Sequence, residues 1–218
     1  MGKADYRLYV IVDEGRRRVD PAAVATEAIE AGATVVQWSG GSRSTRRQIE
    51  TGRTLAEVTR RHGVPLIVAG RVDVMLAIGA DGVLLGPDDM PAVLARRLAG
   101  SEGIVGVFAT DPREALSAAG QGADFVLYEG PVAGVAGNVP APVIAAGLRH
   151  PDEAASALQA GARGVAIVAG QIRGAGVGAV CRAFSEAICR GAGAQQFAAG
   201  TRPFVTEATF GDGRPGFV

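Results

Sequence analysis

The sequence predicts an α/β protein in which eight parallel strands close into a barrel, with helices between them on the outside. Six glycines each stand just ahead of a short apolar run, as in Gly32 before TVVQW and Gly63 before VPLIV. Glycine ends helices without steric penalty, and an apolar run without polar alternation is typical of a strand buried on both faces. Two further segments, YRLYVIV near the start and PVIAAG at 142–147, complete a predicted (β/α)8 TIM barrel.

Strands and helices are expected to alternate along the chain. The predicted strands cover residues 6–13, 34–39, 65–70, 82–86, 104–110, 124–129, 142–147 and 164–170. The predicted helices cover residues 20–31, 44–62, 72–79, 89–99, 112–120, 151–160 and 177–190. Three helix starts carry Asp-Pro or His-Pro, at Asp20, Asp111 and His150, because proline at the first helical position gives up no hydrogen bond. Residues 1–190 are therefore predicted to form the barrel domain, and 191–218 a C-terminal tail.

One helix is predicted to be missing. Between the strands at 124–129 and 142–147 only PVAGVAGNVPA remains, about eleven residues, which is too short for a loop, a helix and a return. The outer faces of these strands would then be bare, and exposed apolar patches are normally covered. We expect the tail, with Phe197, Phe204 and Phe210, or a partner subunit in a homo-oligomer, to cover them. The alternative is that the tail is an unstructured extension.

Charge and composition narrow the function classes. Lys plus Arg and Asp plus Glu number 22 each, which argues against nucleic acid and anionic membranes as partners. No secretion signal and no apolar run of about 20 residues is recognisable, so a cytoplasmic protein is expected. Cys181 and Cys189 fall on one face of a predicted helix and are expected to be buried free thiols.

Several spaced motifs resemble the family of thiamine phosphate synthase and the thiazole tautomerase TenI. They include LYVIVD at 8–13, GVPLIVAGRVDVMLAIGADGVLLGPDDMP at 63–91, GADFVLYEGPV at 122–132 and AGARGVAIVAG at 160–170. The resemblance spans residues 6 to about 190 and implies a (β/α)8 barrel. It also implies the joining of a pyrimidine diphosphate to a thiazole phosphate, with loss of pyrophosphate and help from magnesium.

Most residues that the family uses are replaced in this sequence. Where the family has Q-L-R-x-K the chain has Gln37-Trp38-Ser39-Gly40-Gly41, so the glutamine stays while the arginine and lysine are lost. The family's N-D-R becomes Ala69-Gly70-Arg71, which deletes one metal-binding aspartate. Asp89 keeps the second metal-binding position, so a magnesium site at Asp89 is only weakly supported, because one carboxylate binds a hard cation poorly.

The ligand-binding positions implied by the resemblance continue after the later strands. Thr110 stands where relatives place a histidine that serves as acid or base. The loop that grips pyrophosphate, G-P-x-F-x-T-x-T-K, becomes Gly130-Pro131-Val132-Ala133-Gly134-Val135-Ala136-Gly137-Asn138, without threonine or lysine. Backbone N–H groups in the turns at Gly147 and at Ala169-Gly170 are left to bind one phosphate.

Other residues at the same end of the barrel leave alternatives open. Two basic clusters, Arg16–Arg18 and Arg43, Arg46 and Arg47, either form a new anion site or are solvated. Trp38 either stacks on a flat heterocycle or fills the mouth. Arg71 and Asp73 either contact a ligand or pair with each other, and Asp13 either contacts a ligand or caps a helix. His150 is the one conventional general base near the mouth, or a bystander, and His62 is expected to be structural.

Two functional hypotheses follow. In the first, the chain is a divergent relative of the synthases without synthase activity, and it binds a small phosphorylated or heterocyclic molecule or a protein partner. In the second, it is an enzyme of altered chemistry, a transferase or isomerase acting on a phosphorylated or thiazole-like molecule. An ordinary synthase fits the sequence least, because each lost donor to a departing pyrophosphate costs about 3–4 kcal/mol in the barrier.

Overall fold

The computed structural model describes residues 3–14, 20–41, 43–169 and 176–199. Its strands are β1 (Leu8–Asp13), β2 (Val35–Ser39), β3 (Leu66–Ala69), β4 (Gly82–Leu85), β5 (Ile104–Ala109), β6 (Phe125–Tyr128), β7 (Val143–Ala145) and β8 (Gly164–Val168). Its helices are α1 (Pro21–Glu30), α2 (Thr45–Arg61), α3 (Val72–Ile78), α4 (Ala92–Ala99), α5 (Pro112–Gly120), α6 (Pro151–Gln159) and α7 (Val177–Ala199).

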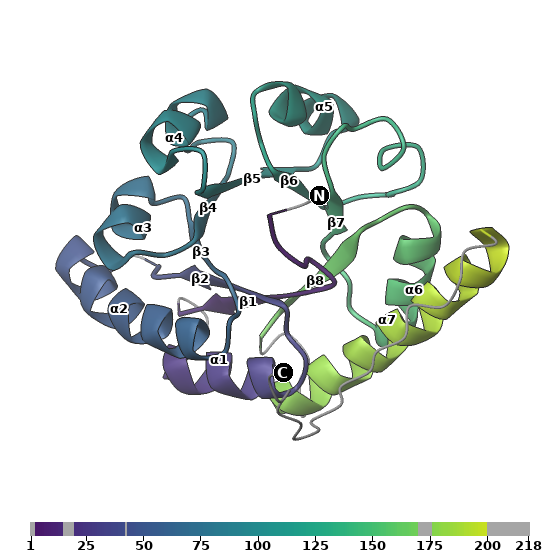
Figure 1. The fold of residues 1–218 in the computed structure, drawn as a ribbon, viewed down its shortest axis with the longest axis horizontal. Coiled ribbons are helices and arrows are strands. Elements are labelled where there is room, and N and C mark those ends of the chain that lie inside the picture. Colours follow the sequence, from purple (N-terminus) through teal and green to yellow (C-terminus); the bar gives the residue numbers. More distant parts are fainter. Residues whose placement is uncertain (1–2, 15–19, 42, 170–175, 200–218) are drawn as a thin grey trace, which may run out of the picture.

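The eight strands form one closed parallel barrel in sequence order, which confirms the predicted fold. Figure 1 shows the ring of strands with the helices around it. The ring closes between β1 and β8, where Tyr9 is opposite Ala166 and Val10 is opposite Ile167. At this seam Gly164 comes so near the backbone of Tyr6 that a Cβ would lie 1.8 Å from the carbonyl oxygen. Only glycine allows that approach.

The core is built in layers on both sides of the strands. One cluster fills the inside of the barrel: Tyr6, Tyr9, Val35, Ile67, Leu84, Ile104, Phe125, Leu127, Ile144 and Ala166. The alternate side chains of the strands, such as Val36 and Val126, belong to two outer clusters that pack against the helices. Every strand is therefore buried on both faces, which explains the apolar runs in the sequence.

The sixth helix is absent, as predicted, and a turn takes its place. Residues 133–138 form this turn between β6 and β7, visible in Figure 1 as a loop beside α5. The prediction that the outer faces of β6 and β7 are bare is wrong. Val132, Val135 and Val139 of this segment are buried in the same cluster as Val126 and Val143, so the turn itself covers the strands.

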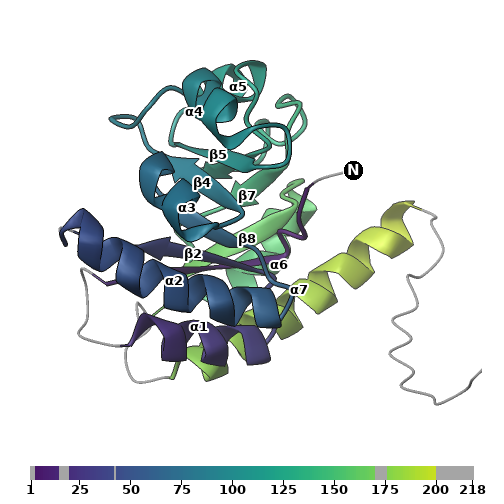
Figure 2. The ribbon, with the colours of Figure 1, turned by 60° about the vertical axis from the view of Figure 1, so that its left-hand side comes forward.

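Two details of the last helix differ from the prediction. α7 runs to Ala199 rather than ending at 190, and its C-terminal end projects beyond the barrel in Figure 2. Cys181 is buried, and burial raises the pKa of its thiol to about 12, but Cys189 is exposed. Both thiols are free. Phe204 and Phe210 lie outside the described residues, and Phe197 falls in the part of α7 whose side chains are not described.

Among the described residues, no helix is both long and apolar enough to cross a bilayer.

Candidate functional site

The floor of the barrel mouth is apolar, with one amide. Gln37 lies inside the barrel with 6% of its surface exposed, and the Tyr9 hydroxyl donates a hydrogen bond to Gln37 Oε1 over 2.9 Å. Burial raises the pKa of Tyr9, so the hydroxyl stays a neutral donor. Ile11, Phe108 and Ala146 are partly buried neighbours of the interior cluster. The predicted site residue Gln37 therefore points into the barrel from the middle of β2, below the end where TIM barrels bind ligands.

Trp38 does not lie at the mouth, so both sequence interpretations of it are wrong. Its indole is fully buried in the outer cluster between strands and helices. Gly52 of α2 makes room for it, because a Cβ there would lie 3.0 Å from the Trp38 ring. Adjacent residues on a strand face opposite sides, so once Gln37 points inward Trp38 must point outward. This indole packs the helix layer and meets no ligand in the barrel.

The environment of Trp38 contains Glu14, a residue that the sequence analysis missed. Trp38 Nε1 donates to Glu14 Oε1 over 3.1 Å. The other oxygen, Oε2, makes no aligned hydrogen bond but lies 2.5 Å from Arg43 Nε in an ion pair. Only 3% of the Glu14 side chain is exposed. A buried indole N–H needs an acceptor, and this rule was the one signal that could have located a partner for Trp38.

Asp89 closes its own turn after β4. Its Oδ2 accepts a hydrogen bond of 2.7 Å from Gly86 N, and Asp89 N donates to the Gly86 carbonyl over 3.2 Å. The carboxylate lies over Gly70 after β3, where a Cβ at position 70 would be 2.8 Å from Oδ1. The space that a side chain at position 70 would need is thus taken by the Asp89 carboxylate.

Arg71 and Asp73 pair with each other, as one of the two alternatives for them predicts. Arg71 Nε and Nη2 donate to the two oxygens of Asp73 over 2.8 and 2.6 Å. The hydrogen bond from Arg71 lowers the pKa of Asp73. Arg71 also reaches α2, donating to Thr45 Oγ1 over 3.0 Å. The guanidinium therefore joins α2 to the start of α3.

The remaining predicted residues spread around the rim. Thr110 is exposed, and its backbone N–H donates to Glu114 over 3.2 Å, at the start of α5. Gly147 adopts φ +80° after β7, and a Cβ there would lie 3.1 Å from Glu129 Oε1. Ala169 N donates to the Ile11 carbonyl over 2.8 Å, so this amide is already paired. Gly170 and Arg16–Arg18 lie outside the described residues.

Both histidines and two arginines of the second basic cluster, Arg46 and Arg47, lie at the ends of helices. His62 ends α2, where its Nδ1 lies 2.9 Å from the Val58 carbonyl, in agreement with a structural role. His150 is exposed at the start of α6, and its backbone N–H donates to Glu153 over 3.4 Å. Arg46 and Arg47 lie exposed in the first turn of α2.

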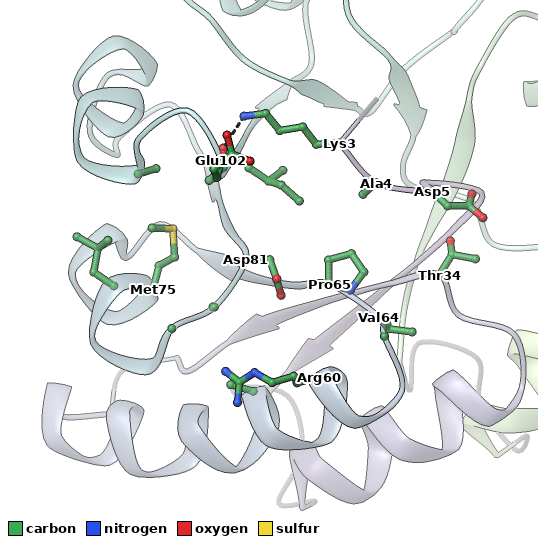
Figure 3. A pocket seen from close by; sticks show the side chains of 18 residues that line it. Lys3, Ala4, Asp5, Thr34, Arg60, Val64, Pro65, Met75, Asp81 and Glu102 are labelled. Atoms are coloured by element: carbon green, nitrogen blue, oxygen red, sulfur yellow. Dashed lines mark hydrogen bonds between the residues drawn. The ribbon is translucent and has the colours of Figure 1, made fainter. Parts of the chain in front are cut away.

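A cavity lies at the other end of the barrel. It encloses about 710 Å³ and is shown in Figure 3. Arg60 at the end of α2, Asp81 before β4 and Glu102 before β5 line it, together with Lys3 of the N-terminal segment. These residues precede the strands, whereas TIM barrels place their chemistry after the strands. The cavity is therefore separate from the mouth that Gln37 and Asp89 mark.

Comparisons with known proteins agree with the fold and with the motifs. A family model described as thiamine monophosphate synthase matches residues 8–135. A thiamine-phosphate synthase of Chloroflexus aurantiacus is 43% identical over 82% of this chain and 90% of its own length. One of Moorella thermoacetica is 35% identical over 76% of this chain and 87% of its own. The solved structure of a thiamine phosphate pyrophosphorylase from Pyrococcus furiosus superposes with a TM-score of 0.79, at 29% identity, over 87% of this chain and 98% of that one.

Proposed function

The chain belongs to the thiamine monophosphate synthase family, and we propose that it binds a small heterocyclic molecule at the barrel mouth without catalysing the family's diphosphate displacement at a useful rate. The observation that carries the proposal is the placement of Asp89. Its carboxylate is bonded to Gly86 N and fills the space beside Gly70.

The described residues do not fit the magnesium site that the family implies. A hard divalent cation prefers several oxygen ligands, and position 70 offers a glycine in place of a second carboxylate. No group of three or more His, Cys, Asp or Glu side chains suited to a metal occurs among the described residues.

Binding of a flat ring is supported by what remains on the floor of the mouth. Phe108 offers a partly exposed aromatic face, and Ile11 and Ala146 surround it with apolar surface. The Tyr9 hydroxyl donates to the side-chain carbonyl oxygen of Gln37. The NH₂ group of Gln37 is then left to donate to a ring nitrogen or oxygen of a ligand. An apolar floor with a few fixed polar groups is typical of small-molecule sites.

A reconstituted assay tests the proposal. The full chain and the Chloroflexus aurantiacus relative are incubated with the pyrimidine diphosphate, the thiazole phosphate and Mg²⁺, and thiamine phosphate is quantified. We expect the relative to turn over and this chain to be slower by at least about 10³-fold, because more than one donor to the pyrophosphate is lost. In parallel, a thermal-shift assay should show that the thiazole alcohol or the pyrimidine alcohol binds, as a rise in the melting temperature of this chain.

Turnover comparable to that of the relative, or growth of a synthase-deficient strain on this chain, would show that the proposal is wrong. Mass spectrometry of the same mixtures reports any isomerised or differently transferred product. Such a product would assign the barrel to an enzyme of altered chemistry.

A further inference from the structure

Glu129 lies at the rim of the mouth, directly after β6. Phe125 and Leu127 of that strand point into the barrel, while Val126 and Tyr128 belong to the outer cluster. The alternation places Glu129 on the inward side. Its backbone N–H donates to the Ala109 carbonyl over 3.0 Å, which continues the pairing of β5 with β6 and fixes the position of the residue.

The Glu129 side chain extends across to the turn that follows β7. Its Cγ and Oε1 both lie 3.1 Å from the position of a Cβ on Gly147. Gly147 has φ +80°, a conformation that favours glycine. A carboxylate thus stands beside the turn whose backbone amides could otherwise receive a phosphate.

The Glu129 carboxylate makes no contact that stabilises the described part of the fold. Other carboxylates near the mouth have partners: Asp89 accepts from Gly86 N, Glu14 from Trp38, and Glu153 from the start of α6. The Glu129 side chain has no hydrogen bond or ion pair to any described residue, and the residue is exposed. An uncommitted negative charge at a ligand-binding end acts on whatever ligand enters.

We propose that Glu129 sets the charge of the ligand: it disfavours a phosphate at the Gly147 turn and favours a heterocycle that is cationic or donates an N–H. This inference rests on the proposed function, because it concerns the same mouth. A carboxylate a few ångströms from a phosphate weakens binding on the order of tenfold or more. The same charge attracts a protonated ring nitrogen or an exocyclic amine.

The test compares affinities across one substitution. Glu129→Gln removes the charge and keeps the shape. Titration calorimetry measures the dissociation constants of a thiazole alcohol, its phosphate ester and inorganic phosphate for the wild type, for Glu129→Gln and for Glu57→Gln. Glu57 is an exposed glutamate on α2 and serves as the matched control.

We expect Glu129→Gln to bind the phosphate ester about tenfold more tightly than the wild type, because a like charge is removed. Affinity for the alcohol should change less than about twofold, and Glu57→Gln should match the wild type. Added salt should reduce the difference between Glu129→Gln and the wild type, since exposed charges are screened.

Equal affinity of wild type and Glu129→Gln for the phosphate ester would overturn the inference, as would failure of both proteins to bind the ester at millimolar concentration. Glu129→Ala, with thermal melts of all variants, checks that the result does not come from misfolding. Synthase turnover by the wild type would overturn the proposed function instead, so the two failures are distinguishable.

Discussion

At the scale of single residues, Glu14 contacts three other residues. Its backbone N–H donates to the Ser39 carbonyl over 3.2 Å, its Oε1 accepts from Trp38 and its Oε2 pairs with Arg43. A carboxylate that is withdrawn from water is costly unless such partners compensate it. Glu14 therefore ties the end of β1 to the end of β2 and to the loop before α2.

Removing this carboxylate should destabilise the fold. We expect Glu14→Ala to lower the free energy of unfolding by about 2 kcal/mol, since the buried Trp38 N–H loses its acceptor. Glu14→Gln should cost less, because an amide oxygen can still accept from the indole. Urea unfolding followed by fluorescence measures both, and Trp38, the only tryptophan, reports on the site itself. Glu57→Ala on exposed α2 should stay within about 0.5 kcal/mol of the wild type. If Glu14→Ala unfolds like that control, the role given to Glu14 is wrong.

Residue-level geometry was the least predictable from the sequence. The run VVQW has no polar alternation that would show which side chains face the barrel interior, so nothing in it indicates that Trp38 faces the helices. Glu14 follows a strand at a position where carboxylates are normally solvated, and its partner Arg43 is far away in the sequence. The prediction that Gln37 belongs to a ligand site comes from the family motif rather than from any local pattern, and it stays a prediction.

At the scale of elements, the turn between β6 and β7 covers the outside of the barrel where a helix would normally pack. The wall of a barrel needs an apolar cover on its outside, and a helix normally supplies it. Here Val132, Val135 and Val139 are buried against the outer face of β6 and β7 in one cluster with Leu158 of α6. Three valines spaced along a turn replace the stripe of an amphipathic helix.

The stability of the barrel should therefore fall when one of these valine side chains is shortened. We expect Val135→Ala to lower the free energy of unfolding by about 1–2 kcal/mol, because two buried methyl groups are removed and a cavity is left. Ala133→Ser, at an exposed position of the same turn, should change it by less than about 0.5 kcal/mol. Chemical denaturation of the two variants measures the difference. Equal stabilities would mean that the valines do not hold the turn on the barrel.

The order of elements was predictable because the strands are short and apolar and six of the eight follow a glycine closely. The end of the last helix was not, since the segment from residue 191 onward shows no clear periodicity. In the structure the helix continues past residue 191 to Ala199. Gly191 packs on α6, where a Cβ would lie 3.0 Å from the Ala155 Cα, so this glycine allows close packing of two helices rather than ending one.

At the scale of the whole molecule, the barrel is complete within the described residues. The ring of strands is closed, and α7 contributes Cys181, Phe184, Ala187 and Ile188 to the core beside β1 and β8. The turn at 133–138 covers the wall where a helix is absent. The proposal that residues 191–218 dock on the barrel or on a partner therefore needs a reason other than the covering of β6 and β7.

Truncation after Ala199 separates these roles of the C-terminal segment. We expect removal of residues 200–218 to change the melting temperature by less than about 3 °C, which for a chain of this size corresponds to roughly 1 kcal/mol, since the cover of β6 and β7 is already in place. Truncation after Gly176 removes the buried side chains of α7 and should abolish cooperative unfolding. Calorimetry measures stability, and light scattering on the same samples reports any change of assembly. A fall of more than about 5 °C without a change of mass would show that the segment packs on its own barrel, whereas a fall with a loss of mass would show that it joins two subunits.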